Sequence, residues 1–301
     1  MKTLETRKGK IAFPAFVPVS RLGTRGGLDA RLQKAIDSVA SAVIVGHAAC
    51  EHPRAVMPAL PVMVTSGSSV LLSYGAMASR RGDIGEIHFP STKKSLTPEQ
   101  VLATQERYAD VAFSFDFPIS FGLDPIEASR RQDLTIACAL WAARAKKRQD
   151  LPLYACVQGW DRQSYRQCAR AYRGRDFAGL AIGGLSTRAD DVANVLSIVE
   201  AVLEEGEGKP VHVFSLGTPS VVGALFAEGV DSISANSWLA MANEGRFWNN
   251  ALSRIERPSG RDKELLALWN LSCATGKRSE QLATEVIRLE KIVEATWHDG
   301  A

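Results

Sequence analysis

The sequence lacks the features that mark membrane-spanning and exported proteins. No apolar run approaches the roughly 20 residues that a helix needs to cross a bilayer. The start of the chain, "MKTLETRKGK", has no apolar core of the kind that signal peptides carry. We therefore expect a soluble protein of the cytoplasm with no membrane partner.

The chain also has few cysteines and a small net charge. The five cysteines are an odd number, lie far apart and form no C-x-x-C pair, which indicates a reducing compartment and buried thiols. The 36 basic and 33 acidic residues leave a net charge of +3, so bulk charge does not point to nucleic acid, although a local basic face would be enough. Candidates for such a phosphate-binding rim are residues 78–83, 129–132 and 146–149, with Arg162, Arg166, Arg170, Arg173 and Arg175.

No low-complexity segment or flexible linker divides the chain, and 301 residues of which 46% are hydrophobic fit one large core. Short runs that are apolar on both faces recur along it, as buried strands of a parallel sheet do. The runs cover residues 11–19, 41–47, 61–67, 109–116, 153–159, 177–185, 211–217 and 230–236.

Segments of helical period separate these runs. Thr97 with Pro98, and Asp124 with Pro125, are typical of a helix N-cap and first turn, and Gly206 suits a helix C-terminus. Eight strand–helix alternations predict an α/β fold, a single (β/α)8 TIM barrel over residues 1–245. The alternative, a doubly wound sheet, would need a G-x-G-x-x-G motif that is absent. Residues 246–301 predict a short C-terminal helical extension packed on the barrel.

Polar residues and glycines follow the predicted strands, at the barrel edge where such folds place their active sites. This set contains only one carboxylate, so it favours a flat, polar, neutral ligand that the backbone approaches closely. Its members are His47, Thr65, Ser66, Gly67, Asp116, Gln158, Gly159, Gly183, Gly184, Gly217, Ser234 and Asn236.

Several of these strand ends resemble, in order, motifs of the tRNA-guanine transglycosylase family. They include "FPAFVPVSRLGT", "SFDFP", "VQGW", "GLAIGGLS", "FSLGTPSVVGALFAEGVD" and "HFPSTKKSLTPEQ", and the similarity spans roughly residues 11–245. That family exchanges guanine in a nucleic acid for a 7-deazaguanine base. The resemblance implies a barrel that needs no organic cofactor and binds guanine or a 7-deazaguanine.

Carried over by position, the residues that read the base are retained. Asp116 would accept hydrogen bonds from the N1–H and exocyclic amine of the base, while Gln158 and the Gly184 N–H would donate to O6, which is a coherent set of partners for guanine. The resemblance also implies contacts from Ser66, His88, Gly159, Gly183 and Leu185. Trp160 replaces the second glycine of the family's Val-Gln-Gly-Gly motif, and its ring could either stack on a base or partly fill the pocket and close it.

The catalytic aspartates of the family are not retained. Ser234 stands at the position of the nucleophile and Thr65 at that of the second aspartate, while the glutamate that supports an aminomethyl-bearing base falls on Ala189. A serine nucleophile needs an adjacent base. The nearest carboxylate by sequence is Asp231, which strand alternation places on the opposite face from Ser234.

The zinc site of the family is also missing. Its C-x-C-x-x-C…His pattern has no counterpart, since Cys273 stands alone in the C-terminal segment and His298 has no companion ligands. We therefore expect no structural zinc.

Three functional hypotheses follow. The first is a glycosyltransferase that exchanges the base of a guanine N-glycoside in tRNA or DNA, by direct displacement because the usual nucleophile is missing. Asp116 is then the one obvious electrostatic contributor. The second is a non-catalytic, base-binding subunit that pairs with an active transglycosylase as a heterodimer; a homodimer is the other assembly we consider. The third is a nucleosidase, in which water takes the place of the incoming base.

Overall fold

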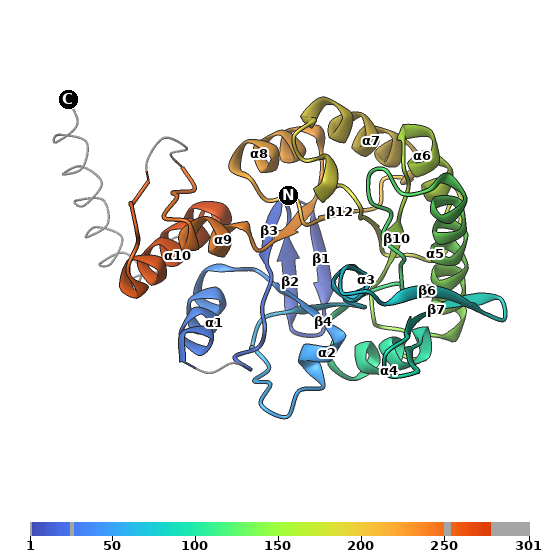
Figure 1. The fold of residues 1–301 in the computed structure, drawn as a ribbon, viewed down its shortest axis with the longest axis horizontal. Coiled ribbons are helices and arrows are strands. Elements are labelled where there is room, and N and C mark those ends of the chain that lie inside the picture. Colours follow the sequence, from blue (N-terminus) through green and yellow to red (C-terminus); the bar gives the residue numbers. More distant parts are fainter. Residues whose placement is uncertain (1, 25–26, 250–253, 278–301) are drawn as a thin grey trace.

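Eight parallel strands form the centre of the computed structural model, which describes residues 2–24, 27–249 and 254–277. The strand order is β3-β13-β12-β11-β10-β9-β5-β4, and helices surround the sheet (Figure 1). Each strand falls within one of the eight apolar runs, so the predicted (β/α)8 architecture is confirmed. The bounds are β3 Ala15–Pro18, β4 Val43–Gly46, β5 Val62–Thr65, β9 Val111–Phe113, β10 Leu153–Val157, β11 Gly179–Ile182, β12 Val211–Phe214 and β13 Ser232–Ala235.

The sheet is nearly closed into a barrel. One parallel bridge between Val19 and Ile44 links the ends of β3 and β4, and the Ser20 N–H donates to the Ile44 carbonyl at 2.9 Å. The buried apolar side chains form separate clusters. A smaller cluster includes Ile11, Met63 and Phe113, and a larger one is shared with the helices. The strands are therefore buried on both faces, which explains why their sequences do not alternate.

The helices begin where the sequence predicted. Thr97 caps α4 (Pro98–Tyr108) in a capping box with Gln100, and the Asp124 carboxylate caps α5 (Pro125–Ala145). The other helices of the barrel are α1 Gly27–Val39, α2 His47–Cys50, α3 Ser68–Ser73, α6 Arg162–Arg170, α7 Val192–Glu205, α8 Pro219–Glu228 and the 3-10 helix η1 Ser186–Arg188.

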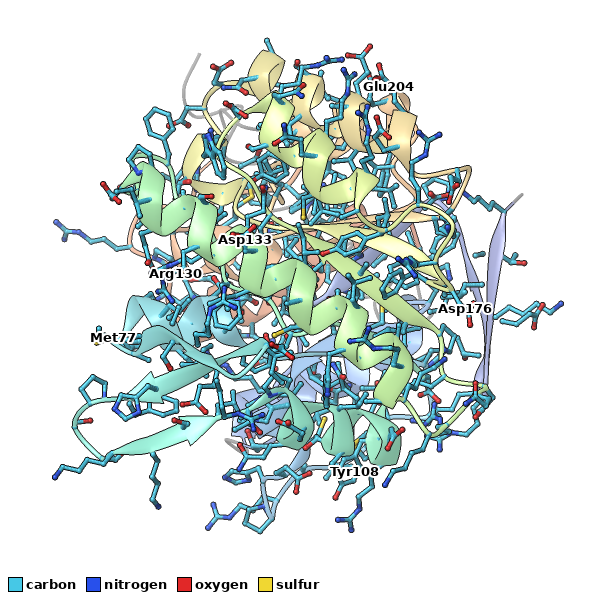
Figure 2. The ribbon with its side chains drawn as sticks, turned by 90° about the vertical axis from the view of Figure 1, so that its right-hand side faces the viewer. Met77, Tyr108, Arg130, Asp133, Asp176 and Glu204 are labelled. Carbon is cyan, nitrogen blue, oxygen red and sulfur yellow. The ribbon has the colours of Figure 1, made fainter. Side chains whose placement is uncertain are left out.

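Two antiparallel additions were not predicted. The chain starts with a hairpin of β1 (Thr3–Thr6) and β2 (Gly9–Ala12), and the cis peptide Phe13–Pro14 separates β2 from β3 inside one apolar run. A three-stranded sheet of β6 (Met77–Arg81), β7 (Ile84–Phe89) and β8 (Lys94–Leu96) follows α3. It projects beside α5, where Arg130 donates to the Ala78 carbonyl at 2.9 Å (Figure 2).

The segment after the barrel is helical where it is described. It contains α9 (Ser237–Asn243) and α10 (Gly260–Thr275), and α10 packs against α9, α1 and β3. The remaining residues, 278–301 with His298, lie outside the described residues, and the division at residue 245 stays a prediction. Among the helices described, none is both long and apolar enough to cross a membrane.

The thiols are buried as expected. Cys50, Cys138, Cys156 and Cys168 lie in the interior, and Cys273 is half-buried. Burial in apolar surroundings raises the pKa of Cys50 and Cys138 to about 12, so these thiols stay protonated and act as small apolar residues.

Candidate functional site

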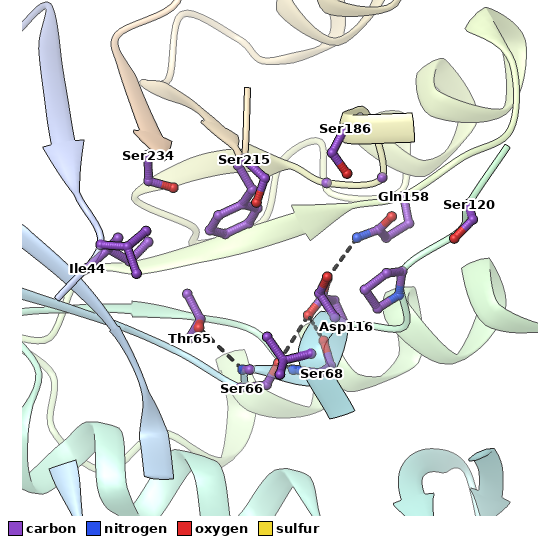
Figure 3. A pocket seen from close by; sticks show the side chains of 18 of the residues that line it. Ile44, Thr65, Ser66, Ser68, Asp116, Ser120, Gln158, Ser186, Ser215 and Ser234 are labelled. Carbon is purple, nitrogen blue, oxygen red and sulfur yellow. Dashed lines mark hydrogen bonds between the residues drawn. The ribbon is translucent and has the colours of Figure 1, made fainter. Parts of the chain in front are cut away.

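A cavity of about 230 Å³ opens at the carboxyl ends of the barrel strands (Figure 3). This is the edge where the sequence placed the site. Residues at or just after all eight strands line it, and Val19 is the contribution of β3. Of the residues singled out from the sequence, it brings together Thr65, Ser66, Gly67, Asp116, Gln158, Gly183, Gly184 and Ser234.

Among the described residues that line the cavity, Asp116 supplies the one carboxylate. Its Oδ1 accepts hydrogen bonds from the hydroxyls of Ser68 at 2.8 Å and Ser66 at 3.1 Å, and its Oδ2 accepts one from Gln158 Nε2 at 2.7 Å. Within the described ranges it has no ion-pair partner. Burial raises the pKa of Asp116, and the three neutral donors offset only part of that effect.

The orientation of the Gln158 amide follows from its surroundings. The backbone N–H of Ile119 donates to Oε1 at 3.3 Å, so Nε2 faces Asp116. An amide nitrogen carries two hydrogens, and Asp116 takes one of them. Gly183 makes this arrangement possible, because a Cβ there would lie 2.2 Å from Gln158 Nε2.

Gly184 brings backbone to the cavity wall. Its φ of +76° lies in the left-handed region, and an added Cβ would lie 2.7 Å from the Ile119 carbonyl oxygen. In the part of the chain that the structure describes, the Gly184 N–H makes no hydrogen bond. The site therefore combines a buried carboxylate, a fixed amide and an unused backbone donor.

Ser234 has a partner that the sequence reasoning missed. Its Oγ lies 3.0 Å from Nε2 of His212 on β12, whose Nδ1 lies 2.8 Å from the Ser232 hydroxyl. His212 is fully buried and packs against Phe113 and Phe214, and burial lowers its pKa to about 3. The imidazole is therefore neutral and a weak base, so it positions Ser234 but gives it little activation as a nucleophile.

A sequence signal for His212 existed. In "VHVF", alternation places His212 and Phe214 on one face of a buried strand, next to Ser232 and Ser234 on the following strand. Asp231 lies away from Ser234, as expected, because its carboxylate accepts from the Val211 N–H at 2.8 Å and pairs with Lys2 at 3.1 Å.

Thr65 is likewise a neutral group in the cavity wall. Its hydroxyl accepts from the Gly67 N–H at 3.3 Å and lies 3.5 Å from the Val45 carbonyl. The neighbouring His47 lies outside the lining, with Nδ1 2.8 Å from the Ser66 carbonyl, and burial lowers its pKa. The two positions that the sequence resemblance assigns to the family aspartates thus carry hydroxyls, and that assignment stays a prediction.

Four residues predicted to contact the base do not line the cavity. His88 lies on β7, where its Nδ1 is 3.3 Å from the Ser95 hydroxyl, and Leu185 is fully buried in the core. Gly159 is closely packed against Tyr165, and the Trp160 N–H donates to Ser164 at the start of α6. Base contacts by these four remain predictions that the cavity does not support.

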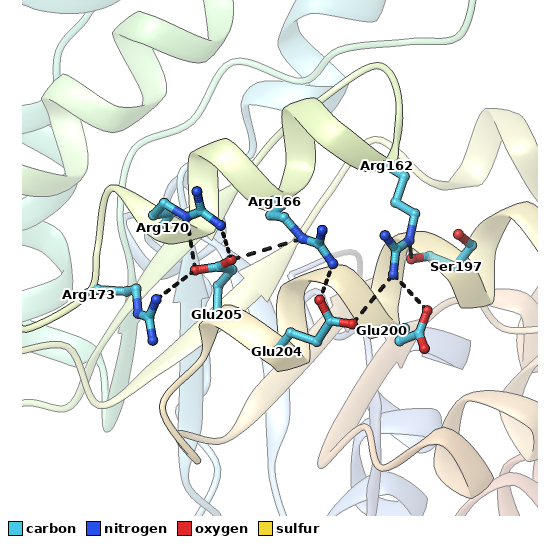
Figure 4. A network of polar contacts seen from close by, with 8 residues as sticks. All are labelled: Arg162, Arg166, Arg170, Arg173, Ser197, Glu200, Glu204 and Glu205. Atoms are coloured by element: carbon cyan, nitrogen blue, oxygen red, sulfur yellow. Dashed lines mark hydrogen bonds and ion pairs between the residues drawn. The ribbon is translucent and has the colours of Figure 1, made fainter.

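Most of the candidate phosphate-binding arginines are already paired. Four of them lie on or just after α6 and contact glutamates of α7 (Figure 4). The pairs are Arg162–Glu200 at 2.9 Å, Arg166–Glu204, Arg170–Glu205 at 2.7 Å and Arg173–Glu205 at 3.2 Å. Arg130 and Arg131 pair with Glu127, and Arg81 pairs with Glu99. These arginines mainly join helices and strands of the barrel surface.

No group of three or more histidine, cysteine, aspartate or glutamate side chains suited to a metal ion occurs in residues 2–24, 27–249 and 254–277. Cys273, on α10, is within this range, but His298 lies beyond it.

Comparison with known proteins agrees with the motifs. The family described as queuine tRNA-ribosyltransferase matches residues 1–281. The chain is 26% identical over 255 residues to the queuine tRNA-ribosyltransferase of Aquifex aeolicus, a match that covers 75% of this chain and 66% of that protein. It is 27% identical over 278 residues to the enzyme of that name from a Thermoanaerobacter species, covering 84% and 72%. A third, from Thiobacillus denitrificans, is 31% identical over 182 residues, 57% of this chain and 48% of the relative. The chain thus spans about two thirds of the length of the Aquifex relative.

Proposed function

Because the chain belongs to the queuine tRNA-ribosyltransferase family, we propose that its cavity binds guanine or a 7-deazaguanine base. The observation that carries this proposal is the Asp116–Gln158–Gly184 arrangement. A carboxylate without a cation can accept from the N1–H and exocyclic amine of the base. The second Nε2 hydrogen of Gln158 and the unused Gly184 N–H supply donors for O6.

The chemistry of this cavity differs from nucleophilic catalysis by a carboxylate. Thr65 and Ser234 are neutral, and His212 is held in its neutral form by burial. We propose exchange of guanine in a nucleic acid by direct displacement at the ribose C1′, in which the bond from C1′ to the departing guanine breaks as the incoming base forms its own bond to C1′ and gives up a proton. The Asp116 pocket would bind the departing base, and the donors that Gln158 and Gly184 offer to O6 would lower the cost of the negative charge that develops on it.

The test is incorporation of labelled guanine into tRNA and into DNA. The wild type should incorporate the label into one of the two polymers, and Ser234→Ala should retain most of that activity, since Ser234 is not the nucleophile in this proposal. Loss of all activity in Ser234→Ala, with trapping of a covalent adduct in the wild type, would show that Ser234 is the nucleophile.

A second candidate is a base-binding subunit of an active transglycosylase. The hydroxyls at Thr65 and Ser234 favour it, because such a subunit can lose both aspartates and keep the pocket. In this case the chain alone would incorporate no label but would form a stable heterodimer with an active relative. Release of free guanine from a nucleoside, without exchange, would instead indicate the nucleosidase.

A further inference from the structure

Arg188 is a buried cation whose guanidinium makes no hydrogen bond to another described residue. It ends η1 (Ser186–Arg188) and is 6% exposed, and its Nε and Nη2 are the buried nitrogens that lack such a partner in this part of the chain. No ion pair involves it among the described residues. Burial of an unpaired guanidinium is costly, so buried charges in folded proteins are normally paired or hold a ligand.

Arg188 directly follows part of the cavity wall in the sequence, although its own side chain is not part of that wall. Ser186 and Thr187, which precede Arg188, both line the cavity, as does Ser120 on the facing loop. The Phe121 N–H donates to the Thr187 hydroxyl at 3.0 Å, which ties the loop to η1. Figure 3 shows Ser120 and Ser186 on the same side of the cavity as Gln158.

An exposed aromatic ring covers Arg188. The ring centroid of Phe121 lies 5.3 Å from the Arg188 Cζ, within cation–π range, yet 71% of Phe121 is exposed. Here the ring covers a cation and offers its outer side to solvent.

The carboxylates next to Arg188 in the sequence do not pair with it. Asp191 accepts from the Asn194 N–H at the start of α7, and Asp190 is exposed and forms no ion pair among the described residues. The missing partner of Arg188 is therefore an anion that this part of the chain does not supply.

We propose that Arg188 and Phe121 form a subsite for a phosphate of the nucleotide whose guanine enters the cavity. This inference rests on the proposed function, since the guanine pocket places the nucleotide next to η1. A guanidinium binds phosphate through two parallel N–H donors, and Arg188 has two unused donors of this kind. Phe121 covers the guanidinium in the free protein and moves aside when the phosphate binds.

The experiment compares guanosine with guanosine 5′-monophosphate by titration calorimetry, in the wild type, Arg188→Gln and Arg188→Lys. The wild type should bind the monophosphate roughly 10- to 100-fold more tightly than guanosine, as expected for charge-assisted hydrogen bonds. Arg188→Gln should bind both equally, with its affinity for guanosine unchanged. Arg188→Lys should keep part of the preference, because it keeps the charge but loses the planar fork.

The matched control is Arg107→Gln, which removes the same charge from an arginine of α4 that also lies over an aromatic ring, with its Cζ 4.8 Å from the ring centroid of Tyr108. It should keep the full preference. Equal binding of both ligands by the wild type, or an undiminished preference in Arg188→Gln, would overturn the subsite while leaving the base pocket intact. Absence of guanosine binding by the wild type would overturn the proposed function and the subsite together. If Arg188→Gln does not fold, Arg188→Lys decides by the same comparison: a full preference overturns the subsite and a reduced one supports it.

Discussion

Asp116 is a carboxylate that three neutral donors hold in a buried cavity wall. Burial raises its pKa, so the folded protein binds this proton more tightly than the unfolded chain does. Protonation of Asp116 would remove one acceptor from the N1–H and exocyclic amine of the base. The same proton therefore acts in opposite directions on ligand binding and on folding.

We expect guanine affinity to fall as the pH is lowered through the raised pKa of Asp116, at a higher pH than for an ordinary aspartate. Protonation of this group should meanwhile add to the stability of the unliganded fold, because a raised carboxyl pKa disfavours the folded state at high pH. Calorimetric titrations of guanine at a series of pH values would measure the first effect. A pH-independent affinity over this window would argue against Asp116 as the acceptor.

His212 should make the fold sensitive to acid. Its pKa is about 3 in the folded protein and about 6.5 when unfolded, so its contribution is present above 6.5 and is lost as the pH falls toward 3. At pH 5 we expect the wild type to lose roughly 2 kcal/mol of unfolding free energy relative to pH 7 from this group. His212→Gln should lose less over the same interval, as measured by urea unfolding. Equal losses in both proteins would show that His212 titrates normally.

At the scale of elements, the geometry of the site depends on the backbone conformation of the turn between β11 and η1. Gly183 and Gly184 let Gln158 and the Ile119 carbonyl approach closely, at distances that no Cβ would tolerate. This turn is the segment in which the sequence motif, the backbone conformation and the cavity coincide.

Gly183→Ala should displace the Gln158 amide and weaken guanine binding about tenfold or more, since it disrupts a charge-assisted hydrogen bond. The control is Gly223→Ala inside α8, where a Cβ meets nothing within 4 Å. This control should bind guanine normally and melt slightly higher, because alanine favours helix. Calorimetry and thermal melting of both variants test the prediction, and normal binding by Gly183→Ala would contradict it.

The sequence predicted the elements whose formation depends on residues that are close together in the chain. Runs that are apolar on both faces, such as 211–217, predicted all eight barrel strands. Thr97 and Asp124 predicted the starts of two helices, because their side chains accept hydrogen bonds from backbone N–H groups of the first turn. It did not predict β6, because "MASRR" is short and charged and gains its order from pairing with β7 and from α5. The contacts of His212 and Arg188 were also missed, since they join residues on different elements.

At the scale of the whole molecule, charge is arranged to hold the barrel wall together. Arg162, Arg166, Arg170 and Arg173 face glutamates of α7 and stabilise the packing of neighbouring helices (Figure 4). Hydrogen bonds from Arg170 are the main cause that lowers the pKa of Glu205. The surface around α6 is therefore less available to phosphates than the arginine count implies.

Glu205→Gln should lower the melting temperature, because it leaves Arg170 and Arg173 without their carboxylate. Arg170→Gln should lower it as well but should leave the affinity for tRNA and DNA unchanged at physiological salt. Thermal melting and a nucleic-acid binding titration check both statements. A marked loss of nucleic-acid affinity in Arg170→Gln would mean that this face does contact phosphate.

The measurement that tests the account most directly is calorimetric binding of guanine to the wild type and to Asp116→Asn. Asparagine has nearly the same shape but no charge, so it removes a charge-assisted pair of contacts and leaves the fold intact. We expect binding by the wild type and a roughly 30- to 150-fold weaker affinity in the variant. Equal affinities, or no binding by the wild type, would contradict the claim that this cavity reads guanine through Asp116.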